Sequence, residues 1–300
     1  MFMAIAVCSS CKKDQKKGSV PPAETHKVNF NVSDFTETLV DHSTNKTHTD
    51  GLKTNATQPL SSFIDEIYYF VFDKNGKFVH YFEQLSSASN FGSVSDELPA
   101  GTYTVVFAAG KSGLLIANDY SSQFTQTNIV NFRLAGYGSL PWLDTFFDKF
   151  QITVTKSDIT QSITLDRIVS QLTVNVLDAI PANAYRIQVT AISYKNYYFS
   201  KGLVSGESAE FNQTFIIPAA AKGTTNYKVS LMTLNTETPS IVIIKCFDSS
   251  GAIMASASVN NVVVHANTQT ILTGNLFNGV DNKFGITVNA KWDAPIFVSF

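Results

Sequence analysis

Apolar side chains recur at every second position along much of this chain, which is the period of a β-strand with one buried face. Residues 172–176 alternate Leu and Val with Thr and Asn, and residues 284–292 alternate apolar side chains with Gly, Thr, Asn and Lys. The run Ile67–Phe72 is apolar on both faces, which is typical of a central strand. No segment keeps a helical period for more than about two turns, so the pattern predicts an all-β protein.

Turn residues separate these alternating runs. Asp73–Gly76 has the composition of a hairpin turn, and Leu98–Gly101 that of a second turn. Short strands at nearly regular spacing, with turns between them, predict β-sandwiches. We expect two sandwiches in tandem, over residues 27–157 and 158–300. Strand candidates in the second half lie at 172–176, 185–191, 209–216, 226–234, 240–248, 252–264, 268–277 and 284–292.

Two segments of the first half break the alternation. Residues 41–58 are rich in Thr, Asn and His and are predicted to form a polar loop. Trp142–Phe150 follows Pro141, and proline is favoured in the first turn of a helix. This pattern predicts a short helix over residues 142–150.

The first residues of the chain have the features of a bacterial lipoprotein signal. A short apolar run, Met1–Val7, leads to Cys8-Ser-Ser-Cys11, and a polar stretch with Lys and Pro follows. Seven apolar residues are too few to span a bilayer, but they fit the end of a signal peptide. We expect residues 1–10 to be removed, Cys11 to carry two acyl chains that give stable anchoring, and residues 11–26 to be a flexible tether. The alternatives are lipidation at Cys8 and an N-terminus with two idle cysteines.

Composition narrows the class of protein. The chain has 300 residues, 44% of them hydrophobic, with 22 Lys and Arg against 24 Asp and Glu, which gives a net charge of −2. This is enough apolar mass for folded cores, and the charge lacks the basic excess of a nucleic-acid binder. The three cysteines exclude a disulfide scaffold and a four-thiol zinc site, and Cys246, in an apolar run, is predicted to be a small buried side chain.

Candidate catalytic chemistry is sparse. His42 and His48 share a polar loop with acidic residues, which is compatible with a metal ion, but a solvated loop is the simpler interpretation. Asp73–Gly76 starts like a calcium loop but lacks the later ligands. Phosphate loops, nucleophile elbows and zinc-protease motifs are absent from the sequence. We expect no enzyme, no cofactor and no metal, although a triad scattered along the sequence stays open.

Aromatic residues offer one binding hypothesis. A flat exposed ring can stack on a sugar, so clustered aromatic side chains are candidates for glycan binding, and packing in the core is the alternative for each of them. The candidates are Tyr137, Trp142, Tyr194, Tyr197, Tyr198 and Phe199.

Several segments together resemble a known family. The chain resembles the fimbrillin superfamily of Bacteroides-type bacteria, and within it the lipid-anchored fimbrial anchor or accessory proteins. The resemblance covers about residues 25–300. The segments that carry it are Cys11–Asp14, Ile67–Asp73, Leu98–Thr104, Leu165–Asn175, Leu272–Phe277 and Ile286–Trp292.

The resemblance implies a tandem pair of transthyretin-like or immunoglobulin-like β-sandwiches. It also implies export as outer-membrane, surface-exposed lipoproteins that assemble by strand exchange. In shaft subunits of the family, a protease removes an N-terminal strand, often after Arg, and the groove accepts a strand of the next subunit. Val28–Phe35 is the corresponding N-terminal strand here, and Ile286–Phe300 is the candidate donor or closing strand. The alternating positions of that segment are Ile286, Val288, Trp292, Ile296, Val298 and Phe300.

Arginine is absent where such processing would occur. The chain has only Arg133, Arg167 and Arg186, and the polar loop offers Lys46 and Lys53 instead. The expected function is therefore a non-enzymatic outer-membrane lipoprotein of fimbria assembly or cell adhesion, which keeps its lipid and associates with partner subunits by β-strand addition. The alternative function is a glycan-binding surface lipoprotein of a polysaccharide-uptake system.

Overall fold

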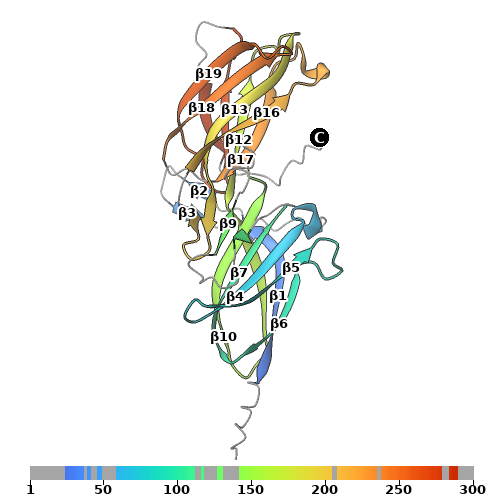
Figure 1. Ribbon diagram of the computed structural model, residues 1–300, viewed down its shortest axis with the longest axis vertical. Helices are drawn as coiled ribbons and strands as arrows, with labels where there is room; N and C mark the ends of the chain where they lie inside the picture. The colour runs from blue at the N-terminus through green and yellow to red at the C-terminus, as the bar shows by residue number, and fades with distance from the viewer. Residues whose placement is uncertain are drawn as a thin grey trace, which may run out of the picture.

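The protein is built almost wholly of β-strands, as the pattern predicts. The computed structural model describes residues 24–36, 39–41, 46–48, 59–111, 116–117, 127–130, 142–204, 208–234, 238–278 and 284–289. Within these ranges, the helical segments are two single 3₁₀ turns, η1 (Leu60–Ser62) and η2 (Ala219–Ala221). The strands form two bodies stacked along the long axis of the molecule (Figure 1). The all-β sandwich class is confirmed.

The first body is one seven-stranded sheet that folds over on itself. Its order is β5-β4-β7-β10-β11-β1-β6, with β1 parallel to β11 and every other pair antiparallel. Strands β10 and β11 share only two residue pairs, so the sheet turns there into two layers, β5-β4-β7-β10 and β11-β1-β6. The strands are β1 (Thr25–Thr36), β4 (Glu66–Asp73), β5 (Phe78–Leu85), β6 (Ser93–Pro99), β7 (Gly101–Gly110), β10 (Thr145–Val154) and β11 (Ile159–Arg167).

Aromatic rings fill the space between these two layers. The Phe30 ring of β1 lies 5.7 Å from that of Tyr69, 5.5 Å from that of Phe107 and 5.6 Å from that of Phe150, measured between centroids. Phe30 is fully buried because the alternation of β1 directs it inward, while the neighbouring Asn29 faces outward and accepts a hydrogen bond from Ser95.

The helix predicted over residues 142–150 is wrong. Strand β10 occupies most of this range and pairs with β7 over ten residues. Phe146 packs in the core of the first body and Phe147 against the second, so both faces are buried and the alternation is lost. The polar loop predicted at 41–58 includes strand β3 (Lys46–His48), which pairs with β2 (Leu39–Asp41) at the start of that range.

The second body is a sandwich of two four-stranded sheets. Their orders are β17-β12-β20-β21 and β16-β13-β18-β19. Cys246 is fully buried between them, as predicted, and burial raises the pKa of its thiol to about 11. The strands are β12 (Val169–Val176), β13 (Ala184–Tyr194), β16 (Ser208–Ile216), β17 (Tyr227–Leu234), β18 (Ser240–Asp248), β19 (Ile253–Val262), β20 (Gln269–Gly274) and β21 (Phe284–Asn289).

The division of the chain between the two bodies follows strand pairing. Strand β11, which begins two residues after the expected division at 157/158, pairs with β1 and β10 in the first body. The chain then enters the second body at β12. The exact limits of two independent domains remain a prediction.

A small third sheet joins the two bodies. It combines β8 (Ile116–Ala117) and β9 (Asn128–Val130) with β14 (Asn196–Tyr198) and β15 (Leu203–Val204), and β9 lies between the bodies in Figure 1. Phe199, just after β14, is fully buried, and its ring lies 5.3 Å from that of Phe70. The two bodies therefore share a continuous apolar junction.

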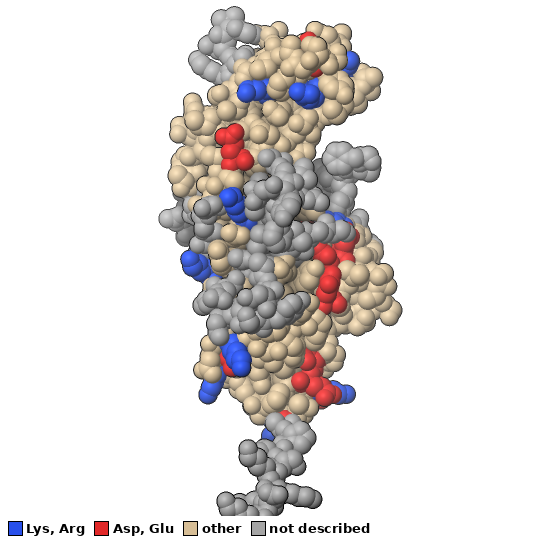
Figure 2. Space-filling view, viewed as in Figure 1, with Lys and Arg blue, Asp and Glu red and all other residues tan. Residues whose placement is uncertain are grey.

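Charged side chains are sparse on the surface. Figure 2 shows Lys, Arg, Asp and Glu in small separate groups on a mostly uncharged face. No helix among the described residues is long and apolar enough to cross a membrane.

Candidate partner-binding edges

The N-terminal strand lies inside the first body. Strand β1 is held between β11 on one side and β6 on the other, and we call this position the β1 slot. Val28 and Phe30 are fully buried, and Val32 is buried. Removal of β1 would expose these apolar contacts and leave unpaired backbone on both β11 and β6, which is what a donated strand needs.

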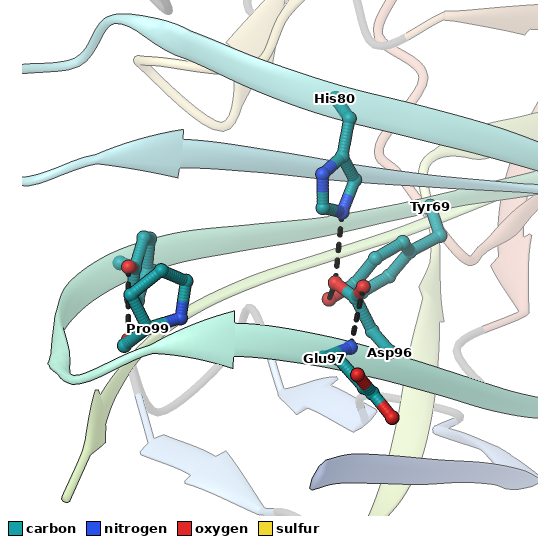
Figure 3. A network of polar contacts seen from close by, with 6 residues as sticks. Tyr69, His80, Asp96, Glu97 and Pro99 are labelled. Atoms are coloured by element: carbon teal, nitrogen blue, oxygen red, sulfur yellow. Dashed lines mark hydrogen bonds and ion pairs between the residues drawn. The ribbon is translucent and has the colours of Figure 1, made fainter. Parts of the chain in front are cut away.

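The two layers of the first body meet along an open side where no ladder joins their edge strands, β5 and β6, in the described part of the chain. Side chains close this side instead. Asp96 of β6 lies opposite Tyr69 of β4 and His80 of β5, and these three residues form what we call the His80 clasp (Figure 3). The Tyr69 hydroxyl donates to Asp96 Oδ2 at 2.9 Å, and His80 Nε2 lies 2.8 Å from the same oxygen.

The clasp favours an ionised Asp96. Burial acts to raise the pKa of Asp96, but the hydrogen bond and charge of His80 and the hydrogen bond from Tyr69 together hold that pKa below its ordinary value. The Glu97 backbone N–H adds a bond to Asp96 Oδ1 at 2.7 Å. Burial and the Asp96 carboxylate raise the pKa of Tyr69, so Tyr69 stays a donor.

A second bridge crosses the same side. Gln84 of β5 donates from Nε2 to the Ser93 carbonyl at 2.8 Å and accepts at Oε1 from the Gly92 N–H at 3.1 Å. Nearby, the Tyr103 hydroxyl donates to the Pro99 carbonyl at 3.0 Å and fixes the turn between β6 and β7. Side chains thus occupy the backbone edge at which a foreign strand would pair.

The second body has an edge of a different kind. In β21, Ile286 pairs with Leu272 and Val288 pairs with Thr270, so the two apolar side chains lie on the core side of the sheet. Leu272 and Thr270 are fully buried, yet Ile286 is 41% exposed and Val288 is 43% exposed. The predicted donor positions Ile286 and Val288 therefore form an apolar strip at the rim of the sandwich.

The predicted aromatic platform is not present at the described positions. Trp142, Tyr197 and Phe199 are buried in the junction, where the Trp142 Nε1–H donates to the Tyr194 carbonyl at 2.9 Å. Tyr194 and Tyr198 are partly buried, and Tyr137 lies outside the described residues. For these three buried rings the alternative to glycan binding, packing in the core, is confirmed, because they pack between the two bodies.

The described arginines lie within strands. Arg167 is buried, and its Nε donates to Asp144 Oδ1 at 2.8 Å. The Arg186 guanidinium lies 4.5 Å from the Phe247 ring centroid. Neither side chain is presented on a loop, where proteases usually cut. Lys46 begins strand β3.

The turn at Asp73 is a hairpin turn, as preferred from the sequence. Asp73 Oδ1 accepts from the backbone N–H groups of Asn75 and Lys77 at 2.8 and 2.9 Å, and the bond from Lys77 is the chief cause that lowers the pKa of Asp73.

Across the described residues, no three His, Cys, Asp or Glu side chains are grouped as metal ligands would be. Other predicted site residues lie outside the described residues: Cys11, His42, Lys53, Trp292, Ile296, Val298 and Phe300.

Sequence reasoning missed the His80 clasp. Its members come from three strands and look unremarkable singly, since Tyr69 sits in an apolar run and His80 in a hairpin return. One signal was available in the sequence. Tyr69 occupies an inward-facing position of β4, and a buried tyrosine needs a hydrogen-bond partner for its hydroxyl.

Solved structures of similar fold come from Bacteroides and Porphyromonas species. A candidate polysaccharide-binding protein from Bacteroides thetaiotaomicron VPI-5482 matches with a TM-score of 0.55 at 13% identity, over 89% of this chain and 96% of that one. A candidate adhesin from Bacteroides ovatus gives 0.53 at 10% identity, over 88% and 96%. The fimbrial anchor protein Mfa2 from Porphyromonas gingivalis gives 0.52 at 15% identity, over 89% and 98%.

These likenesses show that the chain shares the fold of these fimbrial, adhesin and polysaccharide-binding candidates across both bodies. Comparison with curated proteins yields no match. A family model matches residues 93–299, and it describes a family of unknown function, DUF6562.

Proposed function

This chain belongs to the DUF6562 family, and from that premise we propose that it is a non-enzymatic cell-surface protein of fimbria assembly or cell adhesion. The observation that carries the proposal is the match of fold along nearly the whole of the fimbrial anchor protein Mfa2 and of a candidate adhesin. The described residues offer strand edges and an apolar rim as binding features, and these suit association between proteins.

Within that function, we assign the role of a lipid-retaining anchor or fixed surface adhesin. Strand β1 fills its slot with buried apolar side chains, and the described arginines are held inside strands. A diacylated Cys11 followed by the tether 11–26 would attach the first body to the outer membrane. Cleavage after Lys46 or Lys53 is the alternative, and it would separate β1 from the rest of the chain.

Partner subunits would join by strand addition. The strip of Ile286 and Val288, continued along the sequence to Phe300, is the donor candidate because it alternates apolar side chains with polar ones. Backbone hydrogen bonds would supply affinity, and pockets for alternate side chains would supply specificity.

Intact-mass and N-terminal analysis of the protein from its native membrane fraction tests the anchor role. We expect an acylated Cys11 on a chain that retains β1, and fimbrial subunits that copurify with it. A chain that begins after Lys46 or Lys53 without lipid would instead indicate a polymerising subunit with an open β1 slot. Loss of all fimbrial partners from the native complex would count against the function itself.

Glycan binding stays the second candidate, because the protein from Bacteroides thetaiotaomicron is described as a candidate polysaccharide-binding protein. Its test is an affinity gel or glycan array with the full chain. A shift on bacterial polysaccharide that is unaffected by fimbrial subunits would favour it over the anchor role.

A further inference from the structure

The outer face of one sheet of the second body carries an apolar row that includes a cation. Strand pairing aligns one residue from each strand of the sheet β16-β13-β18-β19, and we call this set the distal row. In strand order its members are Ile216, Arg186, Phe247 and Ile253. Ile187 and Cys246, which follow Arg186 and precede Phe247 in the chain, are fully buried in the core, so the distal row points outward. Ile216 and Ile253 are each 57% exposed.

The distal row lies at the end of the second body that is far from the first. Strand β13 reaches the junction at its C-terminal end, where the Tyr194 carbonyl accepts a hydrogen bond from Trp142. Arg186 lies near the other end of β13, which is directed away from the first body (Figure 1). The distal row and the N-terminal end of β1 are therefore at opposite poles of the molecule.

Two cations meet at the distal row. The Arg186 guanidinium lies 4.5 Å from the Phe247 ring centroid, so the ring positions this side chain. Lys245 lies two residues before Phe247, on the same face of β18. It pairs with Gln188 of β13, two residues after Arg186. Arg186 and Lys245 are thus diagonal neighbours about 7–8 Å apart, within reach of two long side chains.

Neither cation has an ion-pair partner in the described part of the chain. Asp248, the acidic residue of β18, uses its Oδ1 to accept from the backbone N–H groups of Ser250 and Ala252 in its own turn. Glu210 shares the outer face of the sheet, but it lies six residues from Ile216 along β16, about 20 Å away. An anion bound between Arg186 and Lys245 would be attracted by both charges.

We propose that the distal row, together with Lys245, binds a carboxylated polysaccharide. The Arg186 guanidinium can bind a carboxylate with two parallel hydrogen bonds, and Lys245 adds a point charge. The exposed isoleucines at both ends offer apolar surface to the C–H faces of sugar rings, and the row spans four strands, or about 14 Å. The row beside it supplies hydroxyl and amide groups for sugar hydroxyls, from Thr214, Gln188 and Ser256.

A sugar chain fits this surface better than an acidic peptide does. The distal row lies on the face of a sheet, where backbone N–H and C=O groups already bond to the neighbouring strands. An extended peptide satisfies its own backbone groups by pairing with an open sheet edge. The hydroxyl groups of a sugar can instead bond to the side chains that the face presents.

This inference deepens the proposed function, because it names a ligand for adhesion, and it rests on that function only for its role at the cell surface. A ligand at the distal row would lie at the pole opposite β1. Anchoring through the N-terminal side and binding at the distal row would therefore not compete for the same surface.

Binding of the purified full chain to immobilised polygalacturonate, measured by biolayer interferometry, tests the proposal. Salt at about 0.15 M screens distant charges. Wild type should bind polygalacturonate and should not bind its methyl ester, which has the same sugar without the charge. Arg186→Gln and Lys245→Gln should each weaken the affinity about tenfold or more, as expected for loss of a hydrogen bond to a charged group. Lys245→Gln decides the result if Arg186→Gln loses stability together with its ring contact.

Lys228→Gln is the matched control. Lys228 is exposed on the outer face of β17 in the opposite sheet, so this variant loses the same charge away from the distal row. It should keep the wild-type affinity. An equal loss in Lys228→Gln would indicate general attraction to a polyanion, and equal binding of the methyl ester would mean that the cations do not matter; each result overturns the proposal.

Poly-L-glutamate tests the other occupant. Binding of this polymer at least as tightly as polygalacturonate would mean that an acidic protein docks at the distal row, and absence of polygalacturonate binding would mean that no such sugar does; both results overturn the proposal. The assay contains no fimbrial partner. Failure here would leave the proposed function standing, and failure of copurification would leave a bound polysaccharide standing.

Discussion

Asp96 is the acceptor on which the open side of the first body depends, since both Tyr69 and His80 bond to one of its oxygens. Replacement of Asp96 by Asn removes a charged acceptor and should lower the free energy of unfolding at pH 7 by about 1–3 kcal/mol. Because the folded pKa of Asp96 is lowered, its contribution is present above about pH 4 and is lost as the pH falls through the folded value.

Urea unfolding from pH 3 to pH 7 measures this effect. Wild type should lose stability on the acid side more steeply than Asp96→Asn. Glu97→Gln is the matched control, because Glu97 is the exposed neighbour on the same strand and lies outside the clasp. If the free energy of unfolding fell equally at acid pH in wild type and Asp96→Asn, the clasp would contribute nothing to stability.

The ionised side chain of Asp148 destabilises the folded protein. Burial, with a smaller contribution from the Asp166 carboxylate, raises the pKa of Asp148 to about 6. The ionised group therefore costs stability above about pH 6, and the cost fades as the pH falls toward the unfolded value of about 4. Asp148→Asn should raise the free energy of unfolding at pH 7.5 by about 1 kcal/mol, less than the full shift implies because the carboxyl still contacts water.

The same variant at pH 4 is its own control, since the wild-type carboxyl is then protonated in the folded protein. The difference between the two proteins should nearly vanish there. A gain that is equal at both pH values would assign the effect to the shape of the amide and not to charge.

Strand β1 is held in the first body mainly by its buried apolar face. Phe30 contacts three other rings in the first core. Phe30→Ala should cost about 3–5 kcal/mol of unfolding free energy, as for large buried aromatics elsewhere. Asn31→Ala, one position away on the outer face, should cost less than about 1 kcal/mol, although it removes the acceptor for Ser93. Thermal and urea unfolding of both variants checks the pair, and similar losses would mean that the slot does not hold β1 by its apolar face.

Strands whose apolar side chains fall on alternate positions could be predicted from that alternation, and β1, β12 and β21 are examples. Strand β10 could not, because Phe146 serves one core and Phe147 another. The parallel pairing of β1 with β11 was also hidden, since Val28 pairs with Ile159 although several other strands lie between them in the sequence, and no local pattern encodes that pairing. The uncovered strip of β21 depends on which strand faces it, which only the assembled sheets decide.

An ion pair of the first body lies at the junction beside the apolar rings, and its arginine also donates a hydrogen bond to the second body. Buried Arg167 reaches Asp144 with two nitrogens, at 2.8 and 3.3 Å, and Asn267 of the second body at 3.4 Å. Burial raises the pKa of Asp144 even though Arg167 opposes that change. Loss of the guanidinium would leave a buried carboxyl without its cation.

Arg167→Met should therefore cost about 3–5 kcal/mol, and the double variant Asp144→Leu/Arg167→Met should recover most of that loss. Calorimetry of the full chain measures both, and separate transitions for the two bodies should appear in the single variant. A double variant as unstable as the single one would show that Arg167 acts through Asn267 or the Phe146 ring, 5.1 Å from its guanidinium, and not through Asp144.

The parallel pairing of β1 with β11 has a mechanical consequence. The N-terminal end of β1 lies at the end of the molecule far from the second body, while β11 leads directly into that body (Figure 1). Tension between a membrane at the N-terminal side and a ligand held by the second body would pull β1 and β11 from opposite ends. The hydrogen bonds between them would then be sheared together and not unzipped one by one. Such an arrangement resists force through slow unfolding, which suits a tether to a moving surface.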